Sequence, residues 1–526
     1  MRPLQRLRVP IRRVDALPAS RRTFATAVDA PANGRERVVI LGSGWAGYVL
    51  SKRLDTRKFA PLVVSPRSYF VFTPLLNDAA VGTLEFRTAL EPVRRKNSGV
   101  SFLQGWADDV DFAEKTVTVE PSALDPDVGH ALTGERQGNR SIQPEGRTVP
   151  TFKVGYDRLI IAVGCYSQTF GTKGVRENAM FLKDVGDARK IRRRILELFE
   201  MAVLPTTSEK VKQDLLHFAI VGGGPTGMEF AAQLWDLVHQ DLWKLYPGLT
   251  DYVRISLYDV APKVLPMFDA SLADYAVRNY KRQGIEIKTS HHVEELRQGF
   301  PNQVTDHPED RMKGGVYTLR TREEGDIGVG MCVWSTGNMM NPFVRKALNT
   351  VHKYPSKSAE ITTGETKLAD QKQWIIERDA KSGSILVDDR LRVQIQTQYK
   401  DREAFMKDVY CLGDVARLAS GPLPATAQVA NQQALWLAKR LNKGDLDTQT
   451  FGFHNLGVMT YIGNAKALFQ GGYTNREGKA KGLKGWLAYL LWRGAYLTMT
   501  LSWRNKILVP MYWMVNRVFG RDITRF

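Results

Sequence analysis

The feature that most constrains this chain is a glycine-rich segment that occurs twice. The first copy follows the aliphatic run Val38 to Leu41 and comprises Gly42, Ser43, Gly44, Trp45, Ala46 and Gly47. A buried strand, a glycine turn and a helix N-terminus in this order bind the pyrophosphate of a dinucleotide. The first glycine makes the turn, the second lets the backbone approach the phosphates, and the third lets the helix pack on the strand. The free N–H groups and the positive dipole end of the helix attract the phosphates.

The second copy follows the apolar run 218–221 and comprises Gly222, Gly223, Gly224, Pro225, Thr226 and Gly227. A single motif of this kind is a weak signal. Two copies, each behind an apolar strand, indicate two bound dinucleotides and electron transfer between them. The repetition therefore predicts an α/β fold with two Rossmann-like dinucleotide-binding domains.

The residues at the ends of the second strands differ between the two units. An acid is expected there to hold the ribose hydroxyls, but the first unit has Ser65, followed by Arg67. A serine hydroxyl can still bond a ribose, and Arg67 can stack on an adenine or meet a phosphate; a plain core loop is the alternative. The second unit has Asp259, whose carboxylate would accept from the ribose and repel a 2′-phosphate. We therefore expect NADH rather than NADPH, with a simple turn acid as the alternative.

Further strands divide the chain between the two units. Strands at 156–164 and 333–338 close the first and second units, and strands at 385–388 and 409–414 return to the first. A carboxylate at the end of the last strand, Asp414, can accept a hydrogen bond from a flavin ribityl hydroxyl. We expect a first part of the flavin domain at 36–170, an NADH domain at 171–345, a second flavin part at 346–446 with a polar insertion at 352–380, and a C-terminal domain at 450–526.

The net charge of +19 lies mainly in two tails. Residues 1–24 carry seven Arg and one Asp, and residues 470–526 carry ten Lys and Arg against two acids. Nucleic-acid binding would need this charge on a domain face, so we discount it. The first tail is rich in Arg and poor in acids, with interspersed aliphatic residues, which is typical of a mitochondrial transit peptide. A basic disordered arm is the alternative.

The C-terminal tail contains two apolar helical patterns. The first runs from Trp486 to Trp503 with Arg493 inside it, and the second, 507–519, is expected to break at Pro510. Trp, Tyr and Arg at intervals favour helices that lie in a membrane interface over helices that span the membrane. A dimerisation or docking pair is the alternative.

Two other features suggest structural roles and not chemistry. The segment 180–213 predicts one charged amphipathic helix, with Arg192, Arg193 and Arg194 on a solvated face. The three cysteines, Cys165, Cys332 and Cys411, are too few and too far apart for a disulfide framework or a metal site. Without Cys-x-x-Cys or Cys-x4-Cys, the dithiol mechanism of the disulfide reductases that share this two-nucleotide architecture is excluded.

From about Arg37 to the C-terminus, the chain resembles the type II NADH dehydrogenases, the single-subunit alternative NADH:ubiquinone oxidoreductases of fungal mitochondria. The basic amphipathic tail is part of this resemblance. The motifs that carry it are Gly42-Ser43-Gly44-Trp45, Val64-Ser65-Pro66-Arg67-Ser68-Tyr69-Phe70, Phe72-Thr73-Pro74-Leu75-Leu76, Gly222 to Gly227 with Glu229, Trp334 to Asn338, and Ala427-Gln428 with Gln432.

The resemblance implies a glutathione-reductase-like two-domain flavoprotein with an amphipathic, helical, membrane-anchoring C-terminal domain. It implies hydride transfer from NADH to non-covalent FAD, then transfer of two electrons and protons to ubiquinone in the respiratory chain, without proton pumping and insensitive to rotenone. The expected FAD residues are Gly42, Ser43, Gly44, Trp45, Ala46, Gly47, Ser65, Arg67, Thr73, Ala162, Gly164, Gly413, Asp414, Ala427 and Gln428. The expected NADH residues are Gly222, Gly223, Gly224, Pro225, Thr226, Gly227, Glu229, Asp259, Thr336, Gly337 and Asn338.

The resemblance also suggests catalytic residues. Gln428 and Gln432 match glutamines of the family's quinone site. Glu229 matches a carboxylate near the nicotinamide and flavin that is proposed there to position substrates or handle protons. Asn431 stands where a relative carries His, so proton delivery by a histidine is not carried over to this chain.

The resemblance places the protein at the mitochondrial inner membrane, as a peripheral homodimer. The transit peptide favours the matrix face. No EF-hand loop begins at Asp445, so neither calcium nor any other metal is expected.

Two other activities share the expected architecture. A sulfide:quinone oxidoreductase needs two redox cysteines near the flavin, for which Cys165 and Cys332 are the candidates. An NADH-gated flavoprotein related to apoptosis-inducing factors would bind NADH but turn over quinone slowly. Bleaching of the flavin by NADH and not sulfide separates the first activity from a type II NADH dehydrogenase, and a quinone assay separates the second.

Overall fold

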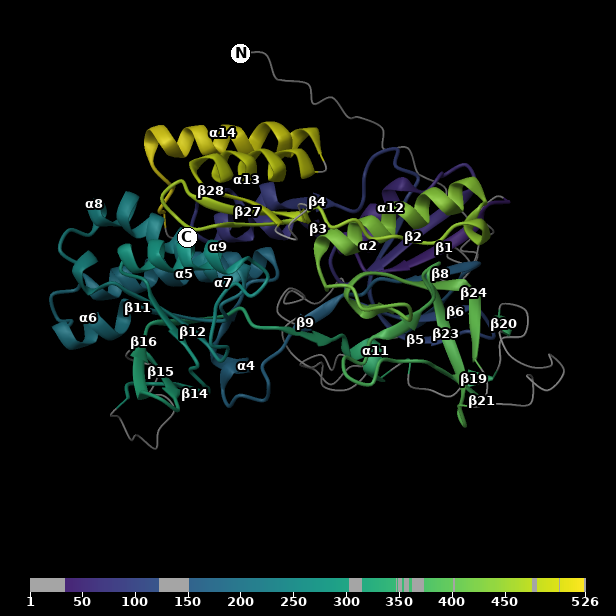
Figure 1. Cartoon of the computed structure of the whole chain (residues 1–526), viewed down its shortest axis with the longest axis horizontal. Coiled ribbons are helices and arrows are strands. Elements are labelled where there is room, and N and C mark those ends of the chain that lie inside the picture. Colours follow the sequence, from purple (N-terminus) through teal and green to yellow (C-terminus); the bar gives the residue numbers. More distant parts are fainter. Residues whose placement is uncertain are drawn as a thin grey trace, which may run out of the picture.

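The computed structural model describes residues 34–122, 151–301, 315–346, 348, 352–353, 359–361, 373–400, 403–474, 480–500 and 502–524. Two α/β units lie side by side, and a C-terminal layer that includes α13 and α14 covers one face of the molecule (Figure 1). The transit peptide predicted at 1–24 and most of the insertion predicted at 352–380 lie outside the described residues.

The first unit is built on a large mixed sheet. Its central strands are parallel and buried, as expected for aliphatic strands that are covered by helices. Along the sheet the strands are His352–Lys353 (β19), Gln373–Ile376 (β21), Arg392–Thr397 (β23), Glu403–Cys411 (β24), Arg158–Ile161 (β8), Glu36–Leu41 (β1), Phe59–Ser65 (β2), Ser101–Asp111 (β5), Thr116–Pro121 (β6) and Phe152–Gly155 (β7). Strands Ala359–Ile361 (β20), Ile385–Val387 (β22) and Ala416–Leu418 (β25) pair at its side.

The chain leaves this sheet after β8 and returns to it with β19, and β24 then joins its central, parallel part. Val409 of β24 pairs with Leu159 of β8 in parallel register, and β8 pairs with β1. The helix after the first glycine motif, Trp45–Arg53 (α2), packs against Ala427–Lys443 (α12). Two helices more than 350 positions apart in the sequence therefore pack together in the same unit.

The second unit is a five-stranded parallel sheet within the described part of the chain. In order, its strands are Met180–Phe181 (β10), Met331–Trp334 (β17), His217–Val221 (β11), Arg254–Asp259 (β12) and Glu286–Thr289 (β13). An antiparallel group adjoins it, formed by Val293–Gln298 (β14), Tyr317–Thr321 (β15) and Gly325–Val329 (β16). Its helices include Pro225–Leu237 (α7) and Ala270–Arg282 (α9), and the π-helix Val238–Leu242 (η4) follows α7.

Short elements complete the two units. Two small ribbons pair Tyr69–Val71 (β3) with Leu90–Pro92 (β4) and Cys165–Ser167 (β9) with Asn338–Met340 (β18). The short α-helices are Leu76–Ala80 (α3), Val175–Asn178 (α4), Trp243–Leu245 (α8) and Pro342–Lys346 (α11). The short 3-10 helices are Thr73–Leu75 (η1), Phe86–Ala89 (η2), Thr250–Tyr252 (η5), Gly413–Val415 (η8) and Leu446–Thr448 (η9).

The prediction of one helix over 180–213 is wrong. The segment forms β10 and two helices, Val185–Ala202 (α5) and Glu209–Leu215 (α6). Asp184 caps α5 in a capping box with Asp187, and Ser208 caps α6. Each cap satisfies N–H groups that are free at a helix start, so each fixes a new beginning.

The prediction that the arginine run lies on a solvated face is also wrong for Arg192. Its side chain is 7% exposed, lies 3.7 Å from Glu85 and stacks over the ring of Phe86. Its guanidinium also donates to the backbone oxygen of Asp522. A cation on the buried face of α5 thus ties the C-terminal end of the chain to the first unit.

The C-terminal layer consists of a three-stranded antiparallel sheet and two helices. Its elements are Val458–Tyr461 (β26), Ala467–Thr474 (β27), Ala480–Gly485 (β28), Trp486–Met499 (α13) and Trp503–Phe519 (α14). The break predicted at Pro510 is absent, because Pro510 lies inside a continuous α14. The first pattern ends at Met499, and Ser502 caps the second helix.

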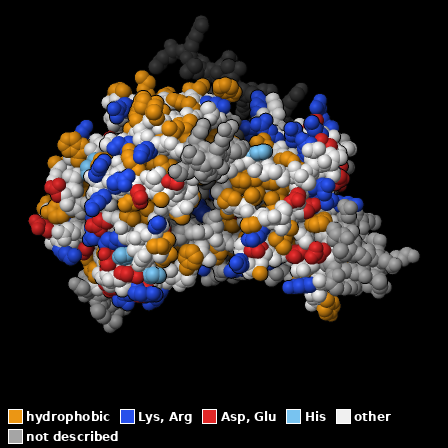
Figure 2. Space-filling view, viewed as in Figure 1, with side chains coloured by type: hydrophobic (Ala, Val, Ile, Leu, Met, Phe, Trp, Pro, Cys, Tyr) orange, Lys and Arg blue, Asp and Glu red, His pale blue; other side chains and the backbone are white. Residues whose placement is uncertain are grey.

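Hydrophobic side chains gather on the outside of this layer (Figure 2). The exposed large apolar residues of the two helices are Trp486, Leu487, Leu490, Leu491, Met499, Trp503, Ile507, Met511, Met514, Val515, Val518 and Phe519. Among the described helices, none combines the length and apolar character needed to cross a bilayer. Apolar exposure on this scale indicates an interaction surface.

The buried position of Arg192 yields a stability prediction. We expect Arg192→Ala to lower the free energy of unfolding by about 2 kcal/mol more than Arg193→Ala, because only the former removes a charge-assisted hydrogen bond of a buried guanidinium and its contact with Glu85. Thermal midpoints of the two variants, both saturated with FAD, measure the difference. Equal midpoints would contradict the structural role of Arg192.

Candidate functional site

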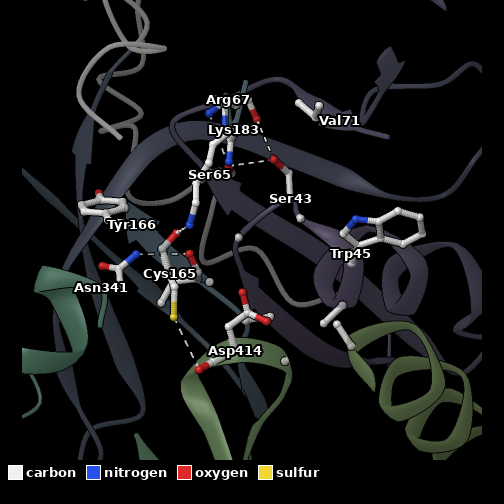
Figure 3. A pocket seen from close by; sticks show the side chains of 18 of the residues that line it. Ser43, Trp45, Ser65, Arg67, Val71, Cys165, Tyr166, Lys183, Asn341 and Asp414 are labelled. Carbon is white, nitrogen blue, oxygen red and sulfur yellow. Dashed lines mark hydrogen bonds between the residues drawn. The ribbon is translucent and has the colours of Figure 1, made fainter. Parts of the chain in front are cut away.

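A cavity of about 410 Å³ lies at the carboxyl ends of β1, β2, β8 and β24 (Figure 3). Ligands of open parallel sheets bind at this edge. The residues predicted for FAD that line it are Gly42, Ser43, Gly44, Trp45, Ala46, Ser65, Arg67, Thr73, Ala162, Gly164, Gly413, Asp414 and Ala427. Gly47 and Gln428, also predicted for FAD, do not line the cavity.

The first glycine turn has the geometry of a phosphate cradle. Gly42 has φ +107°, and a Cβ there would lie 2.3 Å from the carbonyl oxygen of Ala162. A Cβ on Gly47 would lie 2.1 Å from the carbonyl oxygen of Gly42, which explains why Gly47 serves packing and not the cavity. A Cβ on Gly44 would meet nothing within 4 Å. The backbone at Gly44 is therefore open to a ligand, and the turn fits a dinucleotide pyrophosphate.

The hydroxyl of Ser65 is already used within the protein. The Oγ atoms of Ser43 and Ser65 are 2.9 Å apart, and Ser65 Oγ also accepts from the Arg67 N–H. The Arg67 side chain forms an ion pair with Asp184, to which Tyr69 also donates. In place of the usual acid, a small polar network thus joins the end of β2 to the first turn. Direct bonding of Ser65 or Arg67 to a ribose or phosphate stays a prediction.

Asp414 is a half-buried carboxylate that faces the cavity (Figure 3). Burial raises its pKa, and the positive charge of Lys183 lowers it. Among the described residues, its side chain has no hydrogen-bond donor. A carboxylate in this position fits a hydroxyl-rich ligand such as a flavin ribityl chain.

Lys183 is a cavity residue that sequence reasoning missed. Its ammonium donates to Asn338 Oδ1 at 2.7 Å and to the Cys165 carbonyl oxygen at 3.4 Å. Burial lowers its pKa. It follows the end of strand β10 in the second unit's sheet, and a polar residue after the carboxyl end of a parallel strand is the sequence signal that could have revealed it. Lys183 and Arg67 thus bring positive charge to a cavity whose lining also includes the carboxylate of Asp414.

The second glycine turn repeats the geometry of the first. Gly222 has φ +117°, and a Cβ there would lie 2.7 Å from the Ser335 carbonyl oxygen. Asp259 stands at the end of β12 and accepts from the N–H of Gly223 at 2.5 Å and of Ala261 at 2.7 Å. The carboxylate therefore lies beside the turn, where a ribose is expected, and its contact with NADH stays a prediction.

Residues of the second unit also line the first unit's cavity. Of the residues predicted for NADH, those that do so are Thr226, Thr336 and Asn338. The others, which lie away from it, are Gly222, Gly223, Gly224, Pro225, Gly227, Glu229, Asp259 and Gly337. The wall contributed by the second unit is where two bound dinucleotides could bring their reactive rings together.

Glu229 lies one helical turn beyond Thr226 and is 5% exposed. Its carboxylate accepts from Asn77 Nδ2 at 3.1 Å, from the Tyr461 N–H at 3.0 Å and from Trp492 Nε1 at 3.3 Å. Burial raises its pKa to about 7, and these donors oppose that shift. Glu229 can therefore hold or release a proton near neutral pH.

Gln428 and Gln432 bond to a backbone segment of the C-terminal layer. Gln432 donates to the His454 carbonyl oxygen at 2.8 Å and accepts from its N–H at 3.0 Å. Gln428 donates to the Gly457 carbonyl oxygen at 3.4 Å and accepts from the Leu456 N–H at 3.1 Å. Neither side chain lines the cavity, although the neighbouring residues on α12 do. The two amides connect the cavity helix to the C-terminal layer.

The cysteines show no redox pair. All three are free, and Cys165 alone of them lines the cavity. Burial raises the pKa of Cys165 and of Cys332 to about 12, which disfavours thiolates. Within the described residues, no cluster of His, Cys, Asp and Glu could hold a metal ion.

Comparisons with known proteins agree with this geometry. Residues 36–354 match the model of the pyridine nucleotide-disulphide oxidoreductases, and residues 455–522 match the NDH2 C-terminal domain. The fold and the site thus define a two-nucleotide oxidoreductase.

Relatives name the family more closely. The internal alternative NAD(P)H-ubiquinone oxidoreductase A1 of Solanum tuberosum is 33% identical over 93% of this chain and 88% of its own. The external alternative NADH-ubiquinone oxidoreductase of Yarrowia lipolytica is 30% identical over 93% and 81%. The structure of NDH2 from Plasmodium falciparum with NADH has a TM-score of 0.72 at 23% identity, over 93% of this chain and all of that one. The chain therefore belongs to the alternative, or type II, NADH dehydrogenases.

The two glycines of the first turn form a matched pair of tests. We expect Gly42→Ala to lower both the thermal midpoint and the flavin content, because the new Cβ meets backbone at positive φ. Gly44→Ala should keep the midpoint of the FAD-free protein and lose only flavin affinity. Flavin absorbance after purification and thermal melts measure both effects. Normal FAD binding by Gly44→Ala would contradict the binding of the FAD pyrophosphate at this turn.

Proposed function

We propose that this protein catalyses electron transfer from NADH to ubiquinone without proton pumping. The observation that carries the proposal is one cavity lined by the first glycine turn and by Thr226 and Thr336 of the second unit. Positioning two rings in contact is the main task of such a protein, because the cofactor carries the redox chemistry. FAD, when bound, supplies a ring that accepts a hydride and passes on two electrons.

The proposal assigns FAD to the first turn. The turn at Gly42 and Gly44 takes the pyrophosphate, and Asp414 accepts from ribityl hydroxyls. Lys183 places a cation in the same cavity. At the end of β2, where an acid usually stands, Ser65 bonds to Ser43 instead and holds the loop in place.

The proposal assigns NADH to the second turn. Gly222 and Gly224 take its pyrophosphate, and Asp259 accepts from its ribose and disfavours a 2′-phosphate. Thr336 and Asn338 then guide the nicotinamide end towards the shared wall.

Ubiquinone is assigned to the side of the cavity where α12 meets the C-terminal layer. Gln428 and Gln432 hold residues 454–457 there, and so shape the wall that a quinone would meet. The exposed apolar face of α13 and α14 supports a peripheral membrane association, as described for interfacial helices.

We propose a mitochondrial location on the matrix face of the inner membrane, with the protein as a homodimer. The named relatives include internal and external mitochondrial enzymes. The Arg-rich start of the chain favours import. The sulfide:quinone and NADH-gated alternatives are not favoured, since the named relatives are NAD(P)H- and NADH-ubiquinone oxidoreductases and one cysteine lines the cavity.

A spectrum of the purified protein tests the reaction. NADH should bleach the flavin bands under anaerobic conditions, and a soluble ubiquinone should restore them. Sulfide should leave them unchanged. A colourless protein that takes up no FAD, or a flavin bleached by sulfide, would end the proposal.

The glutamine pair tests the quinone side. We expect Gln428→Ala/Gln432→Ala to keep the rate of flavin bleaching by NADH and to lose at least about tenfold in quinone turnover, since hydrogen bonds that shape this wall are removed. Lys439→Ala, an exposed change on the same helix, is the control. Equal loss in both half-reactions would contradict the assignment.

A further inference from the structure

Glu229 lies where three parts of the chain meet. It belongs to α7 of the second unit, whereas Asn77 belongs to α3 of the first. Tyr461 and Trp492 belong to β26 and α13 of the C-terminal layer. The carboxylate accepts one hydrogen bond from the first unit and two from the C-terminal layer.

Neutral N–H groups alone stabilise the ionised form of this carboxylate. Among the described residues, no Lys, Arg or His lies within ion-pair distance of Glu229. Burial is the largest cause of its raised pKa, and the negative charge of Asp78 adds to it. Removing one donor leaves a buried charge less well solvated, which favours the protonated carboxyl.

We propose that Trp492 and Asn77 are positioning residues that fix the orientation and the protonation of Glu229. The inference rests on the proposed function, in which Glu229 serves the flavin–nicotinamide site. It makes the C-terminal layer a part of that site as well as an anchor.

The arrangement of α13 supports this role. Trp492 is 2% exposed and points inward to Glu229, whereas Leu487 on the same helix is 62% exposed. Thr226 on α7 and Thr73, which precedes α3, both line the cavity. Glu229 follows Thr226 by three residues, and Asn77 follows Thr73 by four. The Glu229 carboxylate and its Asn77 donor therefore lie about one helical turn from the cavity wall.

Other ionisable groups face the same junction. Burial and the charge of Glu229 raise the pKa of Tyr280 and Tyr496. Arg493 lowers the pKa of Asp78, which burial raises to about 6. A titration of Glu229 must be distinguished from changes at the other charged or ionisable groups of this junction. These are Asp78, Asp236, Tyr280, Tyr461, Tyr496, Arg493 and Arg521.

The test is the titration of Glu229 in Trp492→Phe, which keeps the ring stacking and removes the N–H. We expect its midpoint to rise by about one pH unit, the size of one hydrogen bond to a charged group. Infrared difference spectra of the FAD-loaded protein follow the carboxyl band, assigned by its absence in Glu229→Gln. The pH profile of quinone turnover should move in the same direction. Trp243→Phe, an exposed tryptophan on α8 outside this junction, should shift neither.

Asn77→Leu provides a second variant and should shift the midpoint upward as well. Unshifted midpoints in both Trp492→Phe and Asn77→Leu would overturn the inference, as would a shift of the pH profile that persists in the Glu229→Gln background. The infrared band needs no turnover, so failure of the proposed reaction is seen separately, as a flavin that NADH does not bleach.

Discussion

The close approach of a glycine turn to the strand that closes each unit is the contact on which the rest of the structure depends. At Gly42 and at Gly222, a Cβ would overlap the carbonyl oxygen of the neighbouring closing strand. The third glycine of each motif sits equally close to the first, so helix, turn and strand are held as one rigid piece. Because this piece occurs twice, the chain can present two nucleotide edges to one cavity.

The ionisable side chains near the cavity differ in their positions and partners. Asp414 and Lys183 face the cavity, and Glu229 lies behind its wall with neutral donors only. Buried ionisable groups of this kind cost stability and are found where function needs a tuned proton or charge. Glu229 lies where the two units and the C-terminal layer meet, whereas Asp414 and Lys183 line the cavity that both units share.

The C-terminal layer has two faces with different physical duties. Its outer face carries exposed apolar side chains of α13 and α14. Its inner face supplies Trp492 and Tyr461 to Glu229, and residues 454–457 to Gln428 and Gln432. The same layer thus carries exposed apolar side chains on one face and hydrogen-bond donors to Glu229 on the other.

The two glycine motifs, Asp259 at its strand end and the family were predictable from the sequence, because they depend on local spacing and on strand periodicity. The partners of Arg192 and the place of Lys183 were not, because they depend on segments far away in the chain, and the pairing of Ser65 with Ser43 depends on how two neighbouring strands are aligned. The predicted helix break at Pro510 was wrong for a different reason. Proline disfavours a helix interior locally, but tertiary packing keeps α14 continuous through Pro510. Local sequence determined the strand–turn–helix units that bind dinucleotides. Only the tertiary structure decided which charged side chains lie beside these units, because those side chains come from distant segments.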